Sequence, residues 1–156
     1  MMTSKEAESK LCAVAGAAEE EYRAKLRTLP PGAALERQAM KISIGMAEFA
    51  RKAGVMLGYA TETPVETRRK SALHWITDEA ERQHILNCPD GEATYLHALV
   101  FMERRFLNGY LEDLEKAKKH GEDKMIFKLE TQAAALTAIL ARWREIGREA
   151  GFSDAC

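Results

Sequence analysis

The sequence predicts an all-α fold, an up-and-down antiparallel bundle of four to five long helices in which residues 1–156 form a single helical-bundle domain. Apolar side chains recur at steps of three and four residues along almost the whole chain, as in amphipathic helices. Short runs rich in Pro and Gly divide this pattern into five segments of about two dozen residues each. The connections are about three to six residues long, and connections this short join antiparallel neighbours.

The first predicted helix covers residues 3–29. Thr3 and Glu6 have the spacing of a capping box, in which a hydroxyl and a carboxylate satisfy free backbone amides at the helix start. Pro30 and Pro31 end the segment, because proline cannot donate a backbone hydrogen bond and restricts the residue before it.

The second predicted helix, residues 33–59, is apolar around most of its circumference. Only Lys41, Glu48, Arg51 and Lys52 form a clear polar strip. We therefore expect this helix to be either the most buried of the five or one half of a dimer interface.

The third predicted helix, residues 63–87, begins with a hydroxyl cap at Thr63 and a proline at the first helical position, Pro64. The run from Cys88 to Gly91 ends it. The fourth and fifth predicted helices, residues 92–119 and 122–150, are separated by Gly121 and carry regular apolar seams.

Composition narrows the possible functions. Hydrophobic residues make up 46% and charged residues 30% of the chain, and the formal net charge is -1. With no basic excess, nucleic acid is an unlikely partner. No apolar run is long enough to span a membrane, and we expect no membrane association. The three cysteines are widely spaced, which fits a reducing compartment, so we expect a cytoplasmic protein.

Glu103 is the one carboxylate that the predicted packing does not explain, because it lies in the middle of the fourth helix's apolar face. A buried carboxylate must find a partner or take up a proton. If the fourth and fifth helices form an antiparallel hairpin about Gly121, Gln132 and Arg144 each lie about 9 Å along the helix axis from the position opposite Glu103. We therefore predict a mostly buried polar centre of Glu103, Gln132 and Arg144, whose role is either structural or functional.

Two weaker patterns involve histidines. Arg69 and His74 have the arginine–histidine spacing of a family of helical ribonuclease domains, but two residues do not establish a resemblance. Glu81 and His84 form one Glu-x-x-His pair, which is half of what di-iron bundles use, and no second copy exists. The pair also falls on the polar side of its helix, so the sequence predicts no metal site and no cofactor.

No motif that carries chemistry is complete, and no family resemblance is specific enough to name. The first hypothesis is a protein without enzymatic activity that acts through protein–protein association, as a homodimer with the second helix near the interface. The second is a small-molecule-binding or hydrolytic bundle centred on Glu103. The third is a ribonuclease-like dimer that uses Arg69 to bind phosphate and His74 as acid or base.

Overall fold

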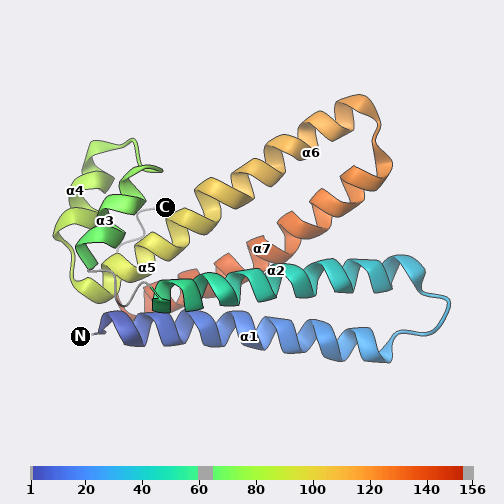
Figure 1. Cartoon of the computed structure of the whole chain (residues 1–156), viewed down its shortest axis with the longest axis horizontal. Coiled ribbons are helices and arrows are strands. Elements are labelled where there is room, and N and C mark those ends of the chain that lie inside the picture. The colour runs from blue at the N-terminus through green and yellow to red at the C-terminus, as the bar shows by residue number, and fades with distance from the viewer. Residues whose placement is uncertain (1, 60–64, 153–156) are drawn as a thin grey trace.

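The computed structural model describes residues 2–59 and 65–152, and this part of the chain is helical without strands, which confirms the all-α prediction. Four long rods dominate the fold (Figure 1). They are α1 (Ser4–Thr28), α2 (Ala34–Tyr59), α7 (Asp123–Glu149) and one continuous rod made of α5 (Asp90–Val100), η1 (Phe101–Leu107) and α6 (Asn108–His120). Two short helices, α3 (Val65–Leu73) and α4 (Glu79–Asn87), cover one end.

The predicted boundaries of the first, fourth and fifth helices agree with the structure to within about two residues. Thr3 caps α1 by accepting a hydrogen bond from the backbone amide of Glu6 at 3.1 Å. Gly121 ends α6 in the left-handed conformation, with a φ of 63°, which glycine adopts without steric cost. None of the helices in the described residues has the length and apolar character needed to cross a bilayer.

Helix α5 lies at the centre of the fold. All ten residues from 91 to 100 are buried, and α5 contacts α1, α2, α3, α4 and α7. The described part of α2, by contrast, has one exposed side that includes Leu35 and Lys41. The most completely buried helix among the residues whose burial is described is therefore α5, and the exposed side of α2 leaves its other predicted role, one half of a dimer interface, as a prediction.

Close packing around α5 depends on two residues of α7. Trp143 is fully buried and its indole Nε1 donates to the backbone oxygen of Leu11 at 3.1 Å, which ties α7 to α1. Gly147 lies directly against the phenol ring of Tyr95, and a Cβ at this position would overlap the ring atoms. The absence of a side chain at Gly147 therefore lets α7 approach α5.

The prediction of a single helix over residues 63–87 is wrong, and its predicted start at Thr63 and Pro64 lies outside the described residues. The helix is interrupted after Leu73, where α3 ends, and helical structure resumes at Glu79, where α4 begins. Asp78 caps α4 by accepting from the amide of Glu81 at 3.0 Å. Arg82 Nη1 donates to the backbone oxygens of Leu73 and Ile76, at 3.0 and 2.9 Å, and so satisfies acceptors that the break exposes.

The π-helix η1 was not predicted, and it changes which side chains enter the core. The predicted seam passed through Glu103 and Phe106, but the buried residues are Met102 and Leu107, which are five positions apart. The amide of Asn108 bonds the backbone oxygen of Glu103, again a step of five. This longer turn moves Glu103 from the seam centre to its edge.

Beyond η1, the rod leaves the body of the protein (Figure 1). Its continuation α6 packs chiefly on α7, through a separate small core of Leu114, Ala117 and Leu129 with Tyr110 and Ile126 beside it. We call residues 108–131, which comprise α6, the Gly121 turn and the start of α7, the arm.

Replacing Gly147 by alanine should lower the free energy of unfolding by about 1–3 kcal/mol, because the added methyl group overlaps the ring of Tyr95 and forces α7 away from α5. Urea denaturation measures the change. Gly45→Ala is the matched control: a Cβ there meets nothing within 4 Å, so helix propensity should raise the stability by about 0.5–1 kcal/mol. Equal effects of both variants would contradict this packing.

Candidate functional site

Glu103 and Arg144 form the ion pair expected from the hairpin register, with Arg144 Nη2 donating to the Glu103 carboxylate. The two side chains are 21% and 27% exposed, so the pair lies at the edge of the core rather than within it. Glu103 therefore bonds to a residue of the fifth predicted helix and keeps about a fifth of its side chain exposed. A carboxylate that accepts from a guanidinium on a neighbouring helix can fix the register of the two helices.

Gln132, the third member of the predicted polar centre, is not part of this pair. Its side chain is half-buried, and it makes no side-chain hydrogen bond to any residue that the structure describes. The reason is distance along α7, since Gln132 and Arg144 are twelve residues, or about 18 Å, apart on one helix.

The residues that follow Glu103 hold η1 to the α3–α4 corner. Arg104 donates to the backbone oxygen of Trp75 and to the carboxylate of Glu81, each at 2.9 Å. The guanidinium of Arg105 lies over the rings of Trp75, Phe101 and Phe106, with distances to the ring centroids of 5.9, 5.3 and 5.3 Å. The guanidinium of Arg105 thus covers the aromatic rings in a cation–π arrangement, and through Trp75 it helps to hold η1 to the α3–α4 corner.

The structure does not bring Arg69 and His74 together as a ribonuclease site would require. Arg69 is buried, and its guanidinium donates to the backbone oxygen of Ile85 at 2.7 Å and to the carboxylate of Asp90 at 2.9 Å. His74 is exposed after the end of α3. Within the described residues, no hydrogen bond joins the two, and Arg69 acts as a link between α3, α4 and α5.

A buried polar layer fills the space between α1, α3 and α5. Arg68 is 2% exposed, pairs with the carboxylate of Glu8, and donates to the hydroxyls of Ser4 and Thr94 at 3.2 Å each. The two hydroxyls are themselves 2.7 Å apart. Three helices are thus joined through one guanidinium.

His97 extends this layer along α5. Its Nδ1 atom is buried and has no hydrogen-bond partner among the described residues. Burial, together with the smaller effect of the nearby positive charge of Arg68, lowers the pKa of His97 from 6.5 to about 4. The ring is therefore neutral at neutral pH, in contact with the apolar core.

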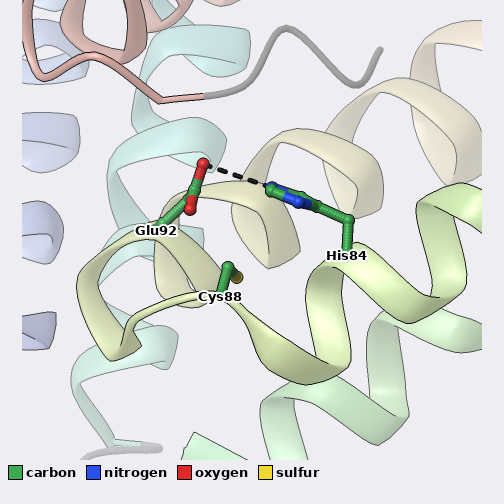
Figure 2. Close-up of side chains that lie close together, drawn as sticks. All are labelled: His84, Cys88 and Glu92. Atoms are coloured by element: carbon green, nitrogen blue, oxygen red, sulfur yellow. Dashed lines mark hydrogen bonds and ion pairs between the residues drawn. The ribbon is translucent and has the colours of Figure 1, made fainter.

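A second cluster lies at the corner between α4 and α5, and Figure 2 shows His84, Cys88 and Glu92 directed toward one another there. The Nε2 atom of His84 is 3.3 Å from the Glu92 carboxylate. Arg69 Nη1 donates to the Cys88 sulfur at 3.7 Å. Burial raises the pKa of the Cys88 thiol, and the Glu92 carboxylate raises it further, so this thiol is not an activated nucleophile.

The sequence pattern pointed to the wrong partner for His84. Glu81, which completes the Glu-x-x-His pair, turns instead to Arg104, while His84 meets residues four and eight positions later. The spacing His84, Cys88, Glu92 was visible in the sequence. It was missed because Pro89 separates the three residues into two helices, and only the corner geometry brings them together.

A cleft lies between the first turns of α2 and α7, away from both polar clusters. Its outer part, of about 470 Å³, is lined by Leu35, Gln38, Asp123, Lys124 and Phe127. A neighbouring hollow of about 390 Å³ continues past Phe127 toward Tyr22 and Met40. Both are wide open to solvent, and Glu103 does not line either of them.

Comparison with known protein families, with curated proteins and with solved structures finds no match to this chain.

A double-mutant cycle on Glu103→Gln and Arg144→Gln should give a coupling free energy of about 1 kcal/mol, because the pair is only partly shielded from water. Chemical denaturation of the four proteins measures it. Each single variant should lower stability, as expected for a structural ion pair. A Glu103→Gln variant more stable than the parent would instead indicate a carboxylate kept for function.

The stability of the protein should fall as the pH falls through the titration of His97. Its folded-state pKa, about 4, lies below the unfolded value of 6.5, so its contribution is complete above pH 6.5 and is lost as the pH falls to about 4. Between about pH 7.5 and pH 5 this residue alone costs about 2 kcal/mol.

Urea denaturation at both pH values, compared between the parent and His97→Gln, isolates this effect. The variant should lose about 2 kcal/mol less on acidification than the parent. His74→Gln, which changes an exposed histidine, serves as the control and should behave like the parent. Identical losses in His97→Gln and the parent would show that His97 does not remain neutral in the folded state.

Proposed function

We propose that this protein acts through association with a second copy of itself, and that the arms of the two copies pair in an antiparallel arrangement. The observation that carries the proposal is the isolation of the arm. Beyond η1, α6 packs chiefly on α7, and three buried side chains form its separate core. A two-helix hairpin with so little buried apolar area gains stability when a further helix covers it.

Apolar side chains on the arm support a covering partner. Leu111 and Met125 are 44% and 45% exposed, and they are two of the four large hydrophobic residues exposed in the described structure. A third, Leu35, is 64% exposed at the start of α2, next to the first turn of α7. This agrees with the expectation that the second helix lies near the interface.

The charges on α6 favour a second copy as that partner. Along the helix the exposed acids Glu112, Asp113 and Glu115 come first, and the exposed bases Lys116, Lys118, Lys119 and His120 follow. Two α6 helices in antiparallel orientation would place each acidic half beside a basic half.

The helix dipole accounts for only part of this charge separation. Basic residues in the last turn of α6 complement the negative end of the dipole. The acidic residues, however, lie inside the continuous α5–η1–α6 rod, more than twenty residues after its start at Asp90, so they do not face the positive end of its dipole. Glu115 pairs with Lys118 of the same helix at 3.9 Å. Antiparallel self-association would in addition place the exposed acids Glu112 and Asp113 beside bases of the second copy, and the net charge of -1 leaves little overall repulsion between two copies.

The other two hypotheses have less support. A ligand or reaction centre at Glu103 would compete with Arg144 for the carboxylate, and neither cleft next to α2 reaches it. A ribonuclease site would need the guanidinium of Arg69, which is buried and bonded to Ile85 and Asp90. The cysteines Cys12 and Cys88 are free thiols, which fits association in a reducing cytoplasm.

Charge reversal tests the antiparallel pairing. Glu112→Lys with Glu115→Lys gives residues 112–115 of α6 a net positive charge like that of residues 116–120, and Lys116→Glu with Lys119→Glu gives both stretches a net negative charge. Each double variant should be monomeric in sedimentation equilibrium at concentrations where the parent is dimeric, because like charges then face each other. The fourfold variant, with both halves exchanged, should be dimeric again.

Mixing the basic-arm and acidic-arm variants should give a heterodimer, which a size difference from a fusion tag on one of them would reveal. Glu20→Lys with Glu149→Lys changes the net charge equally but on exposed positions outside the arm, and should leave the dimer intact. A monomeric parent protein, or dimers in every variant, would exclude this interface.

A further inference from the structure

The corner between α4 and α5 brings three potential metal ligands together from a stretch of nine residues. His84 lies in the last turn of α4, Cys88 is the residue at which α4 ends, and Glu92 lies in the first turn of α5. Figure 2 shows the imidazole, the thiol and the carboxylate directed into the same space. The ligand atoms of the three side chains all lie within 4.8 Å of one another.

We propose that His84, Cys88 and Glu92 bind a thiophilic divalent metal ion of the zinc class. Ligand atoms around a tetrahedral zinc ion are about 3.5 Å apart, so the three atoms must approach one another by up to about 1.3 Å. His84 can supply this movement, because its side chain is 34% exposed whereas the other two residues are buried. The same exposure gives an ion its entry path.

The donor set selects the class of ion. A cysteine sulfur disfavours calcium and magnesium, which take oxygen ligands, and favours zinc and similar ions. One thiolate and one carboxylate balance the charge of a divalent cation, and the neutral imidazole completes three protein ligands. A fourth position would remain on the exposed side of His84 for a water molecule.

Arg69 provides the second observation that supports the site. It donates to the Cys88 sulfur at 3.7 Å from within the protein, where it is 4% exposed. Hydrogen bonds of this kind orient metal-bound sulfur and stabilise its negative charge. The charge of Arg69 is itself balanced by Asp90 at 2.9 Å and Glu66 at 3.5 Å, so it does not repel a cation at full strength.

A metal ion at this site would stabilise the position of α4, which has few buried contacts. In the described structure Ile85 is the one buried residue of α4, and α4 packs mainly on α3 and α5, with an ion pair from Glu81 to Arg104 of η1. Because the ligands come from both sides of the corner, an ion would join α4 to the central helix α5. This role is independent of the arm and of self-association.

Binding of the metal ions alone tests the site. The full chain, reduced with a non-thiol reductant and stripped with a chelator, should bind one equivalent of Zn²⁺ in competition with a chromophoric chelator. Co²⁺ in its place should give a thiolate-to-cobalt charge-transfer band. Zn²⁺ should also raise the midpoint of thermal unfolding, because it binds only the folded corner.

Cys88→Ser should abolish the charge-transfer band and weaken Zn²⁺ binding by at least about 100-fold. His84→Gln changes the most exposed ligand, so the chain should still fold, and binding should fall by a factor of at least about ten. Cys12→Ser changes a free thiol on α1 and should bind metal like the parent.

No stoichiometric binding of Zn²⁺ or Co²⁺ by the reduced parent would overturn the proposal, and so would affinities unchanged in both ligand variants. Because Zn²⁺ binding is measured on monomeric charge-reversal variants as readily as on the parent, failure of this site is distinguishable from failure of the dimer.

Discussion

The complete burial of α5 is the constraint on which the rest of the structure depends. A helix buried on every side cannot leave its polar side chains to water, so each must find a partner inside the protein or, like His97, remain uncharged. Thr94 receives a hydrogen bond from Arg68, and Glu92 lies 3.3 Å from His84. The helices that surround α5 are thereby fixed by polar contacts as well as by apolar packing, since these partners come from α3 and α4.

The chain turns sharply around α5, and arginine side chains satisfy the backbone oxygens that these turns leave without hydrogen bonds. Helices that end in the interior leave backbone oxygens without partners. Arg69 donates to Ile85 near the end of α4, Arg82 donates to Leu73 at the end of α3, and Arg104 donates to Trp75 just beyond it. A guanidinium suits this task because it offers several donors in a fixed plane and complements the negative end of a helix.

The periodicity of apolar residues was sufficient to predict the fold class and most helix boundaries, because these depend on the sequence within each segment. The break at residues 74–78 could not be found in this way, since its exposed carbonyls are satisfied by Arg82 and Arg104 across tertiary contacts. Asp78 and Glu81 do have the spacing of a helix cap, which was a local signal for the start of α4. The contact of Glu103 with Arg144 followed from the hairpin register.

What the sequence could not indicate is the π-helical turn, and this turn explains why one rod has two different environments. A step of five residues between Met102 and Leu107 rotates the buried face of the rod relative to regular α-helical spacing. Before the turn, α5 is enclosed by several helices, and after it α6 packs mainly on α7. The same turn brings Glu103 to the edge of the core, where Arg144 can reach it, and directs Arg104 to the α3–α4 corner. The π-helical turn therefore has two results: α6 and the rest of the arm extend away from the body of the protein, and Arg104 holds η1 to the α3–α4 corner.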